Sequence, residues 1–218
     1  MLEHRRAHLK NVITGATDRG DARSPIRVLD VGGDEGQFIP EIPTIAERAV
    51  LEVSGVRPVD GVETIRTWQE VGRFQPDLIM MCHVLEHTSG ARELVAASAE
   101  ALPAGGLLYL EVPLDRPSRV PAVMGHDWYR LYTRWLARHP FVFRISDALS
   151  LGSRRFLGRP AIGSVIKQNE HINFFDAASL SCVVETLGFQ KIAESVYQPS
   201  SGVPILDVSA LGVLYKRL

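Results

Sequence analysis

The stretch Val28-Leu-Asp-Val-Gly-Gly-Asp-Glu-Gly-Gln-Phe38 decides the fold of this chain. Its first four residues predict a short buried strand, and the glycines that follow predict a sharp turn. A glycine turn directly after a strand lets the main chain approach a ligand closely, because no Cβ atom stands in the way. Asp30, at the end of the strand, places a carboxylate beside that ligand. The sequence therefore predicts a ligand site at this turn.

The turn does not match the dinucleotide-binding fingerprint G-x-G-x-x-G. When the fingerprint is counted from Gly32, its later glycines fall at Asp34 and Gln37. A nicotinamide-dependent oxidoreductase would require the full fingerprint, so this function is disfavoured.

Composition favours one globular domain. The chain has 218 residues, of which 45% are hydrophobic, which suits a single α/β domain with an elaborated loop. A net charge of −1 argues against a nucleic-acid partner. Cys82 and Cys182 lie in apolar stretches, which predicts packed, reduced thiols. Neither a signal peptide nor an apolar run of about 18 residues is predicted, so we expect a cytoplasmic protein.

Short apolar segments alternate with helical segments along the chain. The predicted strands are 26–31, 49–53, 62–66, 77–82, 107–112, 190–197 and 208–215. The predicted helices are 1–12, 91–101 and 177–187, with a short helix or irregular crossover at 41–48. This order predicts an α/β fold with a Rossmann-like, doubly wound, seven-stranded and mostly parallel sheet. The last two strands have no helix between them, so they predict a C-terminal antiparallel hairpin.

A long helical insertion, residues 114–168, interrupts this pattern. Ten basic and three acidic residues give it a charge of +7, so the rest of the chain carries −8. One helical face is expected to hold the apolar residues Trp128, Leu131, Tyr132, Trp135 and Leu136. Arg130, Arg134 and Arg138 form a basic ridge beside it. The insertion is either a lid helix with a solvated basic side or a surface for an acidic partner, such as a phosphorylated substrate, a nucleotide-sugar or an anionic membrane.

Four segments, in their order and spacing, resemble the class I S-adenosylmethionine-dependent methyltransferases, especially the branch that includes sugar and small-molecule methyltransferases. The resemblance covers most of residues 27–189 apart from the insertion. The segments are the glycine turn at 28–36, Val50-Leu-Glu-Val-Ser54, residues 74–87 with 102–113, and Glu170-His-Ile-Asn-Phe-Phe175 with 187–189.

The resemblance implies one methyltransferase domain over residues 1–218, with the insertion as a substrate cap. It implies that S-adenosyl-L-methionine binds where the strand order switches, with Glu52 on the ribose hydroxyls and Asp30 near the positive charge of the donor. No metal site is predicted. The expected cofactor-binding residues are Asp30, Gly32, Gly33, Asp34, Gly36, Glu52, Trp68, Cys82 and His83.

Two features depart from the family pattern. Asp34 replaces the third glycine of the turn, at a position where aspartate tolerates a left-handed backbone better than most residues. The region 52–77 looks too short for both a strand and a full helix, which leaves Thr67, Trp68 and Gln69 as candidates for the adenine pocket. Trp68 either stacks on the adenine ring or packs in the core.

His83-Val-Leu-Glu-His87 matches H-x-x-E-H, the inverted zinc-peptidase signature. That chemistry needs both histidines on one helical face, whereas His83 directly follows an apolar strand. In the methyltransferase interpretation, residues 82 and 83 lie beside the donor. Glu86 and His87 then either face the acceptor or brace the loop.

The catalytic residues predicted are His171, His87 and Glu86. Methyl transfer to oxygen requires removal of a proton, and a neutral histidine such as His171 suits that step near pH 7. The expected reaction is methylation of a hydroxyl on an anionic small molecule or glycan, with Arg130, Arg134 and Arg138 binding the acceptor. A non-catalytic binding protein of the same fold and a zinc hydrolase are the alternatives. Asp176 is expected to cap the last helix.

Overall fold

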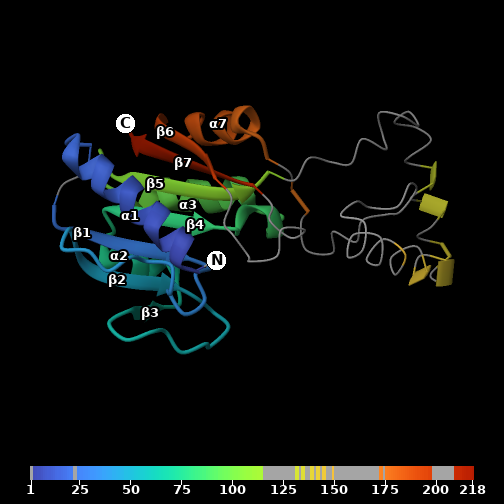
Figure 1. Cartoon of the computed structure of the whole chain (residues 1–218), viewed down its shortest axis with the longest axis horizontal. Helices are drawn as coiled ribbons and strands as arrows, with labels where there is room; N and C mark the ends of the chain where they lie inside the picture. Colours follow the sequence, from blue (N-terminus) through green and yellow to red (C-terminus); the bar gives the residue numbers. More distant parts are fainter. Residues whose placement is uncertain are drawn as a thin grey trace.

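The computed structural model describes residues 2–21, 24–114, 172–173, 175–197 and 209–218. Within the insertion it describes residues 131–132, 134–135, 138–139, 141–142, 144–145 and 149. The described residues form a seven-stranded sheet in the order β3-β2-β1-β4-β5-β7-β6, with helices on both faces (Figure 1). The predicted fold class is therefore confirmed.

Strands β1 to β5 pair in parallel, and the strand order reverses at β1, which pairs with β2 on one side and β4 on the other. β7 pairs antiparallel with both β5 and β6, which confirms the closing hairpin. The strands are β1 (Ile26–Val31), β2 (Ile45–Leu51), β3 (Glu63–Ile65), β4 (Leu78–Cys82), β5 (Leu107–Pro113), β6 (Phe189–Tyr197) and β7 (Ala210–Arg217).

Helix α1 (Leu2–Asp18) packs on one face of the sheet, in front of it in Figure 1. The opposite face carries α2 (Trp68–Phe74), α3 (Ala91–Ala101) and α7 (Ala177–Glu185). A 3-10 turn, η1 (Leu85–His87), follows β4. No described helix is long and apolar enough to cross a membrane.

Region 52–77 was predicted to be too short for a strand and a full helix. It holds both β3 and α2, because α2 is only seven residues long. Thr67 caps the start of α2 by accepting a hydrogen bond from the backbone N–H of Glu70. Gln75 ends it in a left-handed conformation, with a φ of 52°.

Two other predicted boundaries were wrong. Residues 41–44 form an irregular connection, one of the two alternatives predicted for 41–48, and β2 begins at Ile45 and not at residue 49 as predicted. Helix α1 continues past residue 12 to Asp18, since Ile13 and Ala16 are buried against the sheet. Asp176 forms a capping box with Ser179 at the start of α7, as predicted.

Both faces of the central strands are covered, so every residue of β4 is buried. Ile79 and Met81 join the cluster beneath α2, α3 and α7, whereas Met80 and Cys82 join the cluster beneath α1. This alternation follows from the period of two in a strand. Cys182, however, is exposed on α7, against the expectation of a packed thiol.

The described residues of the insertion have helical backbone at several positions between 131 and 149. The apolar face predicted there does not pack on the core, because Leu131 is 57% exposed and Trp135 is 48% exposed. Trp128, Arg130 and Leu136 lie outside the described residues.

Candidate active site

The glycine turn after β1 is shaped around the carboxylate of Asp30. Gly32 has a φ of 69°, and a Cβ added to Gly33 would lie 2.3 Å from a carboxylate oxygen of Asp30. Asp34 adopts the left-handed conformation that its position requires, with a φ of 48°. The turn therefore keeps its tight path although its third glycine is replaced.

Asp30 is fully buried, and neither of its oxygens has a hydrogen-bond partner among the described residues. Burial raises the pKa of Asp30 to about 8, although the nearby Arg5 guanidinium lowers it. Glu111 and Asp34 raise this pKa further through charge repulsion. A buried, unsatisfied carboxyl group in such a turn is suited to bind a cationic ligand.

Glu52 directly follows β2 and lies half-buried beside the same turn. Its carboxylate accepts a hydrogen bond of 2.8 Å from the backbone N–H of Ser54. This bond and weaker contributions from neighbouring backbone groups, including the N–H of Asp34, lower the pKa of Glu52. Glu52 is therefore an ionised acceptor next to the glycine turn, as the resemblance implies for a ribose-binding residue.

His83 follows β4 with a φ of 59°, a backbone conformation that is strained for a residue with a side chain. Its Nδ1 lies 3.0 Å from the carboxylate of Glu86, and its Nε2 lies 3.1 Å from that of Glu111. Burial by itself would lower the pKa of His83, but these two carboxylates raise it to about 9. His83 is therefore a cation near neutral pH and is not available as a proton acceptor.

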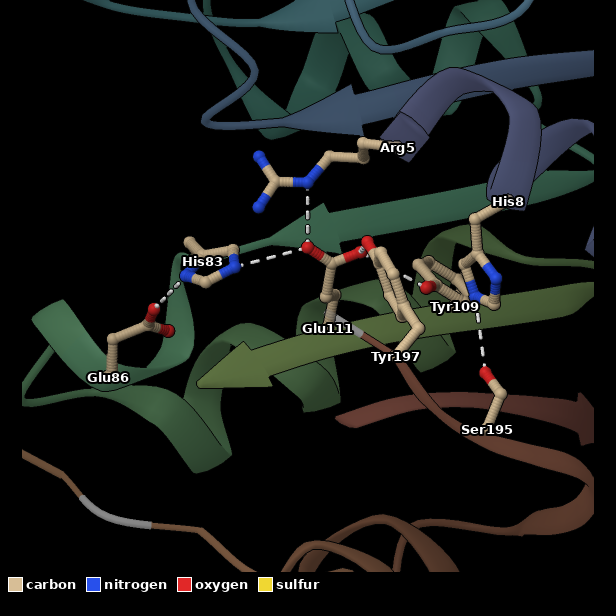
Figure 2. Close-up of polar contacts among 8 residues, drawn as sticks. All are labelled: Arg5, His8, His83, Glu86, Tyr109, Glu111, Ser195 and Tyr197. Carbon is tan, nitrogen blue, oxygen red and sulfur yellow. Dashed lines mark hydrogen bonds and ion pairs between the residues drawn. The ribbon is translucent and has the colours of Figure 1, made fainter. Parts of the chain in front are cut away.

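Glu111, fully buried in β5, is the centre of a polar cluster that the sequence did not predict (Figure 2). It pairs with Nε of Arg5 at 2.8 Å and accepts hydrogen bonds from Tyr197 at 2.5 Å and Tyr109 at 3.2 Å. Burial would raise the pKa of Glu111, but the bond from His83 and the charge of Arg5 outweigh it and lower the pKa. We call Arg5, His83, Glu86, Tyr109, Glu111 and Tyr197 the Glu111 cluster.

The H-x-x-E-H residues do not have the geometry of a zinc site. His83 is in a left-handed conformation before a 3-10 turn, so His83 and His87 do not share one face of an α-helix. Both ring nitrogens of His83 already face carboxylates. Among the described residues, no group of three His, Cys, Asp or Glu side chains is arranged to hold a metal ion.

The segment at 172–173 is bound to the η1 loop. The backbone N–H groups of Ile172 and Asn173 both donate to the carbonyl of Glu86, at 2.7 and 3.1 Å. The side-chain amide of Asn173 donates to the carbonyls of Leu85 and Thr88. Residues 172 and 173 therefore contact η1, far away in sequence, just beyond the carboxyl end of β4.

The predicted site residues fall into three groups. The first group lies at the carboxyl ends of parallel strands. The residues of the glycine turn follow β1, Glu52 follows β2, and Cys82 and His83 lie at the end of β4, with Glu86 and His87 next in η1. Trp68 packs against the hydrophobic core at the start of α2. His171 and Arg130 lie outside the described residues, whereas Arg134 and Arg138 are exposed in the insertion.

One signal in the sequence pointed to the Glu111 cluster. An acidic residue in the otherwise apolar strand Leu-Leu-Tyr-Leu-Glu-Val-Pro is buried and therefore needs partners. Arg5 and Tyr197 carry no such signal, because they come from α1 and β6, and only the tertiary fold brings them to β5.

A profile of a known family, described as a methyltransferase domain, matches residues 1–194. The chain belongs to this methyltransferase family. It is an S-adenosyl-L-methionine-dependent methyltransferase domain, and the buried Asp30 and the glycine turn suit a cationic cofactor of this kind. None of the curated protein sequences matches this chain.

Solved structures share the fold at low sequence identity. The YcgJ protein from Bacillus subtilis is 13% identical, with 99% of this chain and 98% of that chain covered and a TM-score of 0.54. An S-adenosylmethionine-dependent methyltransferase from Archaeoglobus fulgidus is also 13% identical, with 100% and 95% covered and a TM-score of 0.55. These similarities support the architecture of the methyltransferase and do not identify its acceptor.

Proposed function

We propose that this methyltransferase transfers a methyl group to a hydroxyl of a small molecule or glycan, and that the acceptor or its carrier is anionic. One observation supports the donor site above the others. Asp30 is buried in the glycine turn, where the strand order switches, without a hydrogen-bond partner among the described residues. Open sheets of this kind bind ligands at the switch point.

The donor-binding residues that we propose are the turn residues, Glu52, Cys82 and His83, with Trp68 as a candidate beside the adenine. Asp30 faces the positive charge of the donor, and ionised Glu52 accepts hydrogen bonds from the ribose. When bound, S-adenosylmethionine supplies a methyl group already activated by its sulfonium. The protein residues therefore need to position the acceptor and exclude water.

For an oxygen acceptor, we propose His171 as the group that takes the proton. Ile172, the next residue, is hydrogen-bonded to the carbonyl of Glu86, which supports a place for this segment beside the η1 loop. His83 is unsuitable because its raised pKa keeps it protonated. We also propose that Glu86 and His87 lie on the acceptor side of the site, because they belong to η1, the turn whose Glu86 carbonyl binds the residue after His171.

The anionic nature of the acceptor or carrier rests on the insertion. Arg134 and Arg138 are exposed, and neither forms an ion pair with another residue that the structure describes. Together with Arg130 they are the acceptor-binding residues that we propose. Guanidinium groups pair with two oxygens of a phosphate or carboxylate at once.

The test of the donor site is Glu52→Ala. Loss of hydrogen bonds to a charged acceptor should weaken binding of S-adenosylmethionine by about 1.5–3 kcal/mol, or roughly tenfold to a hundredfold. Titration calorimetry measures this change directly. Glu100→Ala, an exposed position on α3, is the matched control and should bind as the parent does. Parental affinity in Glu52→Ala would remove this residue from the site.

A further inference from the structure

The insertion exposes a set of large apolar side chains to solvent. Phe141 is 75% exposed and Leu149 is 63% exposed, and both have helical backbone. The spacing of Phe141, Ile145 and Leu149 is four residues, so in a helix they follow one side. The exposed apolar residues described between 131 and 149 are Leu131, Trp135, Phe141, Val142, Ile145 and Leu149.

Basic side chains accompany this apolar set. Arg134, Arg138 and Arg144 are exposed, and among the residues that the structure describes none of them pairs with a carboxylate. The sequence from 131 to 149 contains one acidic residue, Asp147. We call the six apolar residues and these three arginines the docking face. It combines a high positive charge with apolar area that water does not favour.

This combination limits the partners that fit. A nucleic acid would match the arginines but would not cover so many aliphatic and aromatic side chains. A small anionic metabolite would bind an arginine or two and leave most of the apolar area in water. An anionic bilayer surface accepts both, because tryptophan, phenylalanine and leucine enter the interface while arginines contact the lipid headgroups.

We propose that the docking face binds the surface of a bilayer that contains anionic lipid. The described residues of the insertion extend beyond the carboxyl ends of the parallel strands (yellow in Figure 1), on the side of the sheet that carries the glycine turn. We infer that this bilayer is the anionic carrier that presents the acceptor hydroxyl, an inference that rests on the proposed function.

The test is sedimentation of the whole protein with vesicles of phosphatidylcholine alone or with about one third phosphatidylglycerol. We expect binding to the anionic vesicles and little binding to the neutral ones. Arg134→Gln/Arg138→Gln should weaken binding to the anionic vesicles by about 25-fold, because each arginine near a bilayer surface contributes about fivefold and the two effects multiply. Phe141→Ser/Leu149→Ser should weaken it by at least tenfold, since each side chain loses its transfer into the interface.

Matched controls replace residues of the same kinds elsewhere. Arg73→Gln/Arg92→Gln removes two exposed arginines, and Val196→Ser/Leu218→Ser removes two apolar residues that are 58% and 75% exposed. Both controls should bind vesicles as the parent does. The proposal is overturned if the parent does not bind anionic vesicles, or if the controls lose as much binding as the docking-face variants.

A second outcome would assign the face to another copy of the chain. In that outcome the parent self-associates without lipid, Phe141→Ser/Leu149→Ser is monomeric, and neither protein binds vesicles. The bilayer proposal would then be wrong. Calorimetric titration with S-adenosylmethionine separates this failure from a failure of the proposed function. Donor binding should be the same in the parent and in all four variants.

Discussion

We predict that the protonation state of Asp30 decides how the proposed donor site responds to pH. Its carboxyl is buried, and its raised pKa of about 8 means that the folded protein holds a proton there at neutral pH. The unfolded chain releases that proton near pH 3.8. Between these values the folded state binds more protons than the unfolded state, so Asp30 makes the free energy of unfolding fall as pH rises. Above about pH 8 this contribution becomes constant.

Donor binding should reverse that preference, because a bound cation favours the ionised carboxylate. We expect binding of S-adenosylmethionine to release a proton below about pH 8, so that affinity rises with pH by up to about tenfold per unit and then levels off. Calorimetry in two buffers of different ionisation enthalpy measures the released proton directly.

Asp30→Asn should bind the donor more weakly and with no proton release. Asp60→Asn, at an exposed position, should retain the pH profile of the parent. Equal proton release by the parent and Asp30→Asn would assign the titration to another group.

His171→Ala tests the proposed proton acceptor. For a hydroxyl acceptor, we expect turnover to fall by roughly a hundredfold or more, because general-base catalysis contributes about that much. Affinity for S-adenosylmethionine, measured by calorimetry, should stay unchanged. His126→Ala, in the insertion, is a control of the same residue type. If His171→Ala keeps full turnover, the histidine is structural or the acceptor needs no base.

At the residue scale, the sequence predicted that Asp30, Glu52 and His83 lie at the carboxyl ends of parallel strands, and the structure has them there. This could be predicted because the end of a buried strand is marked by local sequence. Their role in donor binding stays a prediction. Arg5 and Tyr197 were not found, because their contacts with Glu111 join α1, β5 and β6. No local pattern records which distant side chains a buried acid will meet.

Helix α1 is held at its N-terminal part by a buried ion pair and not by apolar packing alone. Arg5 contacts Glu111 at 2.8 Å, and its guanidinium lies 4.5 Å from the ring centroid of Phe38, just after the glycine turn. His8 stacks on Tyr197 at 4.0 Å. The helix therefore packs close to both the glycine turn and the Glu111 cluster.

Arg5→Met should lower the free energy of unfolding by up to about 3–5 kcal/mol, because the buried Glu111 carboxylate loses one of its two cationic partners and keeps only His83. Urea unfolding measures this loss. Arg6→Met is the matched control, because Arg6 is more exposed and its contact with the exposed Glu41 is long, at 3.9 Å. This variant should lower the free energy of unfolding by less than about 1 kcal/mol.

The double variant Arg5→Met/Glu111→Leu should be less destabilised than the sum of its single variants, because removing both charges leaves neither unpaired. Strict additivity would mean that the two side chains act independently, and this account of the α1 contact would be wrong.

At the element scale, six of the seven described strands were predicted within two residues of their bounds, whereas β2 begins four residues earlier than predicted and the short helix α2 was missed. β1 matches its prediction in full because its apolar run ends at glycine. Helix α2 was missed because seven residues are too few for an apolar period to stand out, and its tertiary contact through Trp68 stabilises it.

Across the whole molecule, charge is separated between the sheet domain and the insertion. The insertion carries +7 and the rest −8, and the structure adds that apolar side chains in the insertion are exposed beside the arginines. The architecture of the sheet could be predicted from the order of strands and helices. The packing of the insertion could not be predicted, because an amphipathic helix has the same sequence pattern whether its apolar face meets a core, a partner or a bilayer.

The position of β7 has a consequence for how the chain is made. β7 lies between β5 and β6, although the ribosome synthesises it after both. Until residues 210–217 have emerged, β6 has no strand that joins it to the sheet, and β5 presents an unpaired edge. A nascent chain that has already formed β1 to β5 therefore keeps an open sheet edge until β7 emerges, and this edge can pair with the strands of other chains.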